Sequence, residues 1–197
     1  MKKIFFESAI PILLLLLAVQ PLHAEEYALP TPSACFRQAA DRYTIPVELL
    51  IAVAEAESGL TPFAMNRAGA AILPRSREEA EAVLKRIGSE RPTFDVGIMQ
   101  VNRWWFERYG VPYEKGLDVC FNVDFGARIL AMAIKDHGFT WKAVGAYHSP
   151  TGWRQSAYAM RIYTRLARIL ENRRVVPLQE LLESKLERVS AVYDPGR

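Results

Sequence analysis

The sequence predicts a mainly α-helical fold in a single domain. Apolar residues recur at helical spacing in several segments, residues that start and stop helices flank them, and no strand pattern of any length is visible. The chain has 197 residues and a formal net charge of +3. That length suits one compact domain with its own core, and so small a charge does not favour a nucleic-acid binder.

The first 24 residues have the composition of a secretory signal peptide. Lys2 and Lys3 precede an apolar run over residues 10–19, and Ala24 comes before an acidic pair. A permanent anchor is the less favoured alternative, because the run is shorter than the roughly 20 residues that a spanning helix needs. We expect an exported chain that begins near Glu25, with no later membrane-spanning segment.

The chain holds two cysteines, Cys35 and Cys120. Export would place them in an oxidising compartment, so we expect a disulfide between them. In the chain-entropy model a loop of this length contributes about 4 to 5 kcal/mol to stability. Few histidines accompany the cysteines and no Gly-rich phosphate loop is present, so we expect no metal and no cofactor.

Two helices are predicted near the start of the exported chain. Ser33 is expected to cap the first, which runs to about Tyr43. The second spans Pro46 to Gly59, because proline suits the first helical position and glycine can take the left-handed conformation that ends a helix. Positions 47, 50, 51 and 54 give this second helix an apolar stripe.

The second helix carries two glutamates in different settings. Glu57 continues the apolar stripe, whereas Glu55 lies seven residues after Glu48 and is expected to meet solvent. Burial raises the pKa of a carboxyl group, which makes Glu57 the candidate proton donor. The alternative is a glutamate at a helix end that simply faces solvent.

An irregular connection over residues 60–70 is followed by an insertion at about 71–94. Ser76 and Glu79 form a capping box for a charged helix through about Ile87, which we expect to be exposed. Such connections often form one wall of a cleft.

The segment from Phe94 to Trp105 combines amide and aromatic side chains. Gln100 and Asn102 stand beside Met99 and two tryptophans, a mixture that suits sugar hydroxyls and ring faces. A buried core patch in which Gln100 bonds to the backbone explains the composition equally well.

Three further helices are predicted: one from near Asn122 to Gly138, a short one holding Trp141 and Tyr147, and a long one from about Tyr158 to Arg173. A polar helix from Leu178 to about Val192 lies in a C-terminal tail, 176–197. Positions 154, 161, 165, 168, 173 and 174 are all arginine. This basic face could meet an anionic wall, a membrane or an acidic partner, and the alternative is an ordinary solvated surface.

Several short blocks recur in the order seen in a known family. They are Glu57-Ser58-Gly59, Ala64-Met65-Asn66 with Gly69-Ala70, Gly97-Ile98-Met99-Gln100-Val101-Asn102, Ala146-Tyr147-His148, and Tyr158. Over about residues 35–165 the chain resembles the Slt-type lytic transglycosylases, and it is similar to the small specialised members of secretion and conjugation systems. The resemblance implies a lysozyme-like domain of the goose type over residues 25–175, with a long sugar-binding groove.

The resemblance also implies a reaction. The glutamate of the Glu-Ser block is the single catalytic acid and base of that family, and it corresponds to Glu57. The implied activity is cleavage of the β-1,4 bond between N-acetylmuramic acid and N-acetylglucosamine in peptidoglycan glycan strands. The 6-hydroxyl of the sugar then closes a 1,6-anhydro ring. The family gives Asp95 no catalytic role. The resemblance further implies a periplasmic, wall-associated protein whose partners are components of a secretion, pilus or conjugation apparatus.

The residues matching the family's substrate-binding positions are Ser58, Met99, Gln100, Asn102, Tyr147 and Tyr158. One block departs from the family pattern, because His148 stands where asparagine is usual and Pro150 where glycine is usual. His148 and Ser149 do not form a nucleophile and base pair by this reading, since adjacent side chains point in different directions. Two alternatives to the transglycosylase stay open: a hydrolase with the same groove, and a wall-binding assembly factor without catalysis.

Overall fold

The computed structural model describes residues 31–90 and 93–173. In chain order the elements are α1 (Pro32–Tyr43), α2 (Val47–Ser58), β1 (Met65–Arg67), β2 (Ala70–Ile72), α3 (Arg77–Ser89), β3 (Phe94–Val96), β4 (Val101–Asn102), α4 (Arg103–Tyr109), the 3-10 helix η1 (Tyr113–Leu117), α5 (Val119–His137), α6 (Trp141–His148) and α7 (Gly152–Arg173). The predicted mainly α-helical class is confirmed. The predicted signal peptide and C-terminal helix lie outside the described residues.

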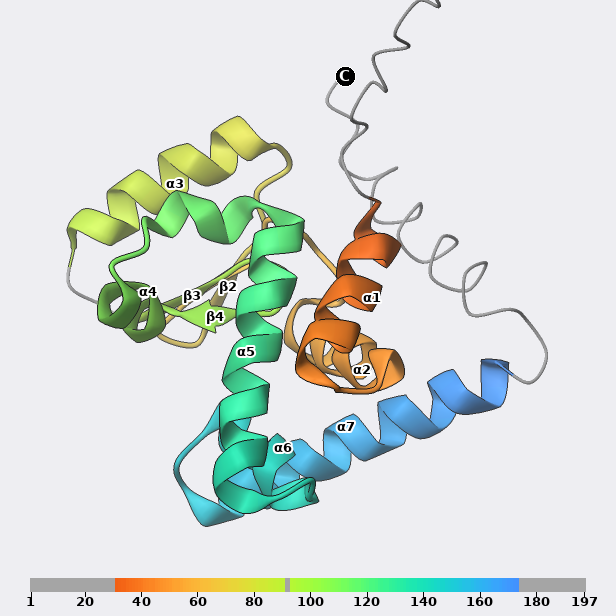
Figure 1. Cartoon of the computed structure of the whole chain (residues 1–197). Helices are drawn as coiled ribbons and strands as arrows, with labels where there is room; N and C mark the ends of the chain where they lie inside the picture. Colours follow the sequence, from red (N-terminus) through yellow and green to blue (C-terminus); the bar gives the residue numbers. More distant parts are fainter. Residues whose placement is uncertain (1–30, 91–92, 174–197) are drawn as a thin grey trace, which may run out of the picture.

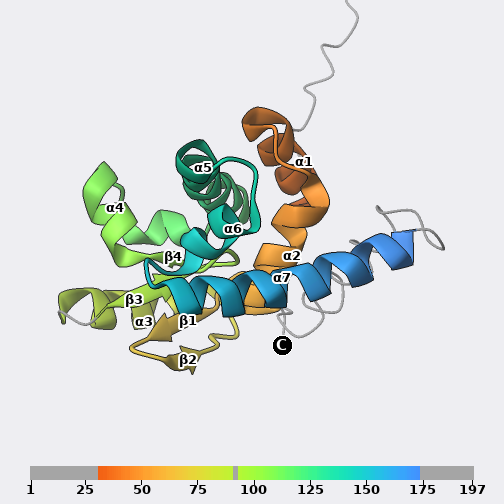
Figure 2. The same ribbon diagram turned by 90° about the horizontal axis from the view of Figure 1, so that it is seen from below.

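The helices pack around α5 and α2. Figure 1 shows α5 running through the middle of the molecule, with the sheet, α3 and α4 on one side of it and α1 and α2 on the other. The pairs α1 with α5, α2 with α7, α5 with α6, and α6 with α7 are in contact. Seen from below, α7 crosses α2 (Figure 2). No described helix combines the length and the apolarity that crossing a membrane requires.

Helix α1 is fastened to α5 by a disulfide. Thr31, rather than the predicted Ser33, is the N-cap residue of α1, because its side-chain oxygen accepts a hydrogen bond from the backbone N–H of Ala34. Cys35 in α1 is bonded to Cys120 in α5, with their Cα atoms 4.8 Å apart. The bond therefore joins two helices through cysteines that are 85 positions apart in the chain.

Helix α2 is deeply buried. Leu50, Ala52, Val53 and Ala54 have no exposed surface. The helix begins after Pro46, which takes the N-cap rather than the first helical position, and it ends at Gly59 with a φ of 64°. The backbone N–H of Gly59 bonds to the last turn, which closes the helix where the two predicted motif residues Glu57 and Ser58 stand.

A small antiparallel sheet was missed by the sequence analysis. Its strand order is β2-β1-β3-β4, and Met65 lies opposite both Ile72 and Val96. Each strand has only two or three residues, which is too short for alternation of apolar and polar residues to be recognised. The segment expected to be an irregular connection therefore contains β1, the first strand of a hairpin. Strand β1 also pairs with β3, the strand that leads into the Gly-Ile-Met-Gln block.

Helix α3 is present where the insertion was predicted. Ser76 caps it, accepting a hydrogen bond from the backbone N–H of Glu79 at 3.2 Å. The helix is not fully exposed as expected, because Ala80, Leu84 and Ile87 are buried. Their spacing of four and three residues forms a single apolar stripe, so α3 is an amphipathic helix that belongs to the core.

Candidate active site

The candidate acid Glu57 lies at the C-terminal end of α2. Its side chain is 12% exposed, and its Oε1 atom is buried without a hydrogen-bond partner among the described residues. Burial raises the pKa of Glu57 to about 7. The hydroxyl of Tyr158 and the charge of Arg161 act in the opposite direction and favour the ionised form. Near neutral pH the carboxyl can therefore both give and take a proton.

The neighbouring Glu55 does not face open solvent as the helical period suggested. Its side chain is 19% exposed, and its Oε1 atom lies 3.8 Å from Nη1 of Arg168. The reason is tertiary, since α7 packs across α2 and covers the face on which Glu55 stands. The two glutamates differ in partners more than in burial.

The turn after Glu57 is tied to the Gly-Ile-Met-Gln block by Ser58. Its Oγ atom donates to the backbone oxygen of Ile98 at 2.7 Å and lies 3.2 Å from that of Ala54. The short bond joins the end of α2 to the loop between β3 and β4. Ser58 thus fixes the distance between the acid and the segment predicted to bind sugar.

The loop between β3 and β4 is held in place by Asn122, a buried residue of α5. Its Oδ1 atom accepts from the backbone N–H of Met99 at 2.7 Å, and its Nδ2 atom donates to the backbone oxygen of Val96 at 3.0 Å. Gly97 takes a φ of +83°, and a Cβ there would lie 2.3 Å from both Asn122 Nδ2 and the oxygen of Gly116. The block therefore needs glycine for its conformation and for its close packing.

Gln100 sits in the left-handed region with a φ of 46°. Its Nε2 atom donates to the backbone oxygens of Ala64 and Gly97, both at 2.8 Å. The amide thus links the loop to the start of the hairpin, as the core-patch alternative expected. Such a strained backbone at a non-glycine residue is typical of functional loops.

Met99 and Asn102 occupy positions that the motif alone does not reveal. Met99 has no exposed surface and packs on Gly126, so its side chain lies beneath the surface. Asn102 caps α4 through its Oδ1 atom, and its Nδ2 atom donates to Asp95 at 2.8 Å. Contact of either side chain with sugar stays a prediction, and both have structural roles in the present conformation.

Two tyrosines and a histidine complete the surroundings of Glu57. Tyr147 donates to the backbone oxygen of Met99 at 2.8 Å. The buried hydroxyl of Tyr158 lies close enough to Glu57 to lower its pKa, but among the described residues it makes no hydrogen bond within the usual distance and angle limits. The ring of His148 stacks on Tyr158 with centroids 4.5 Å apart, and its Nδ1 atom is 3.9 Å from Glu57 Oε1. Burial, followed by the nearby arginine charges, lowers the pKa of His148, so the imidazole is mainly neutral at pH 7.

Three contributors to this site were not predicted from the sequence. Asn122 was named only as the start of a helix, although a polar residue within an apolar helix is itself a signal. His148 was noted as a departure from the family pattern and considered as a base for Ser149, but not as a neighbour of Glu57. Arg161, whose charge acts on Glu57 and whose guanidinium lies 5.0 Å from the Tyr158 ring centre, was seen only as part of a basic stretch.

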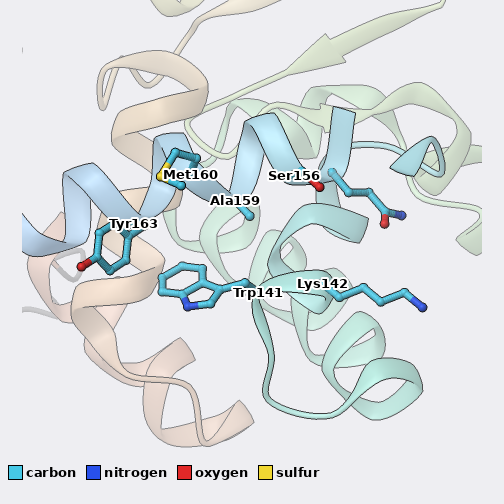
Figure 3. Close-up of a pocket in the computed structure, with 7 residues that line it drawn as sticks. Trp141, Lys142, Ser156, Ala159, Met160 and Tyr163 are labelled. Carbon is cyan, nitrogen blue, oxygen red and sulfur yellow. The ribbon is translucent and has the colours of Figure 1, made fainter. Parts of the chain in front are cut away.

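A separate pocket lies on the other flank of α7, and Glu57 is not among the residues that line it. It is lined by Trp141, Lys142, Gln155, Ser156, Ala159, Met160 and Tyr163 (Figure 3). The rings of Trp141 and Tyr163 meet edge to face, 5.5 Å apart. Across residues 31–90 and 93–173 no group of three or more His, Cys, Asp or Glu side chains could hold a metal ion.

Comparison with known proteins identifies matching sequences. Residues 34–161 match the family described as the transglycosylase SLT domain. The chain is 32% identical over 145 residues to the invasion protein IagB of Salmonella typhi, covering 70% of this chain and 78% of that protein. It is also 32% identical over 143 residues to protein IpgF of Shigella sonnei, covering 68% and 80%. A shorter match, 32% over 89 residues, covers 44% of this chain and 37% of the type IV secretion system protein virB1 of Brucella abortus.

Proposed function

Because the chain belongs to the SLT transglycosylase domain family and is a lytic transglycosylase, we propose that Glu57 is its catalytic acid and base. The substrate is the peptidoglycan glycan strand, cut between N-acetylmuramic acid and N-acetylglucosamine. One observation carries the proposal: a buried carboxyl at the end of α2 has a pKa of about 7, and one of its oxygens has no hydrogen-bond partner within residues 31–90 and 93–173. A group that must act first as acid and then as base works best with its pKa near the working pH.

Glu57 acts twice in the proposed reaction. Its proton passes to the glycosidic oxygen as the bond from that oxygen to C1 of the muramic acid breaks. The carbonyl oxygen of the 2-acetamido group bonds to C1 and holds the positive charge. The Glu57 carboxylate then takes the proton of the 6-hydroxyl, whose oxygen attacks C1 and releases the acetamido group. The 1,6-anhydro sugar forms without water, and Glu57 ends protonated as it began.

Asp95 supports a second candidate, a hydrolase. Its charge acts on Glu57, and most glycosidases use two carboxyl groups roughly 5 to 9.5 Å apart. Burial raises the pKa of Asp95, and its Oδ1 atom accepts from Asn102 at 2.8 Å, so its lone pairs are partly occupied. Such a carboxylate is better suited to anchoring β4 against β3 than to attacking a sugar, which favours the transglycosylase.

Product analysis separates the two reactions. The exported chain, purified from the periplasm of an expression host, is incubated with peptidoglycan sacculi, and the products are identified by mass spectrometry. Anhydro ends, retained in Asp95→Asn and lost in Glu57→Gln, support the proposal. Reducing ends that disappear in Asp95→Asn would establish the hydrolase instead. Unchanged cleavage by Glu57→Gln would remove Glu57 from the mechanism.

The proposed setting is local opening of the cell wall for a secretion, pilus or conjugation apparatus. One relative is named as a type IV secretion system protein and another as an invasion protein. The disulfide between Cys35 and Cys120 suits the periplasm, where such bonds form and persist.

A further inference from the structure

Helix α7 carries a row of arginines that passes beside Glu57. Arg154, Arg161, Arg165 and Arg168 fall on one flank of the helix, because their spacings of seven, four and three residues return to nearly the same side. The charges of Arg161 and Arg165 act on Glu57. The row therefore adjoins the catalytic carboxyl and extends away from it along α7.

The row has an excess of positive charge. Of its four members only Arg168 lies within ion-pair distance of a described acidic residue, Glu55, and its own side chain is 57% exposed. Arg154 and Arg161 are exposed, and Arg165 is half-buried. Arginines three and four residues apart on one helix face repel each other, so the arrangement is unfavourable until an anion is bound.

We propose that this arginine row binds the carboxylates of the peptide stems carried by the muramic acid residues of peptidoglycan, so that the enzyme prefers peptide-bearing to peptide-free glycan. The inference rests on the proposed function, because the stem must hang from the sugar that Glu57 cleaves. A guanidinium group pairs with a carboxylate through two parallel hydrogen bonds.

The dimensions of the row fit a short peptide. The seven positions from Arg161 to Arg168 span about 10 Å at 1.5 Å per residue of helix. An extended peptide covers the same length in about three residues at roughly 3.3 Å each. A stem attached near Glu57 can therefore lie along the row and meet successive guanidinium groups.

An anionic membrane is the less favoured ligand. The arginines that would touch a bilayer lie on the flank of α7 that adjoins Glu57. A lipid surface on that flank would obstruct the approach of a glycan to the acid, whereas a stem that hangs from the glycan arrives with it.

The test compares two forms of one substrate. Linear glycan strands are prepared from sacculi with an endopeptidase, and half of them are stripped of stems with an amidase. We expect kcat/KM of the exported chain to be on the order of tenfold higher for peptide-bearing strands at low salt, the effect of one or two charge-assisted hydrogen bonds. Salt should reduce this preference, and the double variant Arg165→Gln/Arg168→Gln should lower it toward one, mainly through KM.

Two controls make the result specific. Arg37→Gln/Arg86→Gln removes the same charge from exposed positions on α1 and α3, and should keep the wild-type ratio. The inference would be overturned if the ratio of kcat/KM for peptide-bearing to peptide-free strands were the same in the wild type and in the α7 double variant. It would also be overturned by a double variant that loses binding to anionic vesicles while its substrate ratio stays at the wild-type value.

Failure of the proposed function is recognised separately. Binding of both kinds of strand to Glu57→Gln is measured by calorimetry, which needs no cleavage. A preference in binding without any cleavage by the wild type would support the arginine row and reject the proposed reaction. The absence of a preference in both binding and cleavage would reject the row alone.

Discussion

Replacing Glu57 with glutamine should remove a pH-dependent penalty on folding. Burial raises the pKa of this carboxyl from 4.5 to about 7. Below pH 4.5 the group is protonated in the folded and unfolded chain alike, so it costs nothing. As the pH rises from 4.5 to 7 the unfolded chain loses this proton while the folded one keeps it, and stability falls. At 1.36 kcal/mol per pKa unit, the full penalty above pH 7 is about 3 kcal/mol.

Urea unfolding at pH 4 and pH 8 measures this penalty. The difference in unfolding free energy between Glu57→Gln and the wild type should be about 3 kcal/mol more favourable to the variant at pH 8 than at pH 4. Comparing the two pH values cancels any effect of the amide that does not depend on pH. Glu81→Gln, whose carboxyl is 47% exposed on α3, controls for the loss of one negative charge.

The reasoning would be refuted by a difference that is the same at both pH values to within about 0.5 kcal/mol, the usual size of a surface substitution. Glu57 would then ionise in the fold as readily as in water. A carboxylate of that kind could not donate a proton at neutral pH, and the proposed first step would have no donor.

Three further outcomes follow from the structure. The alkaline limb of kcat/KM should lie near pH 7, because Glu57 must be protonated in the free enzyme, and a limb near 4.5 would contradict the raised pKa. Gly97→Ala should lower the unfolding free energy by about 2 to 4 kcal/mol through overpacking and left-handed strain. As a control, Gly110→Ala should lower the unfolding free energy by only about 1 kcal/mol, because Gly110 has a φ of 63° but a Cβ added there has no atom within 4 Å. Replacing Cys35 and Cys120 with serine should lower the unfolding free energy by about 2 to 5 kcal/mol, as measured by urea unfolding, and no change would show that the bond adds nothing to stability.

The helices could be predicted because their signals are local. The termini of α2 follow from Pro46 and Gly59, and the capping of α3 follows from Ser76. The sheet could not be predicted, because its strands are very short and its central pairing, β1 with β3, joins segments about 30 positions apart, as Met65 with Val96 shows. Pairing of that kind leaves little trace in two or three residues.

The candidate site also combines features that could be predicted from the sequence with features that could not. Periodicity favoured a position toward the core for Glu57, since the apolar stripe of α2 belongs to its own sequence, and the motif distinguished this position from a solvent-facing one. Periodicity misplaced Glu55, because the covering helix α7 comes from a distant part of the chain. Met99 was expected to meet sugar through its motif, yet packing against Gly126 leaves it no exposed surface. Motifs identify residues that act together, whereas tertiary packing decides which of them reach the surface.

The arginine row and the acid are linked through charge. Arg161 and Arg165 lower the pKa of Glu57, against the larger effect of burial. A stem carboxylate bound to either arginine would cancel part of that positive field, so binding would raise the pKa of Glu57 further. The enzyme would then hold its catalytic proton most firmly while peptide-bearing substrate is present. The alkaline limb of kcat, which reports the bound enzyme, should accordingly lie at higher pH than the limb of kcat/KM, and only for strands that carry stems.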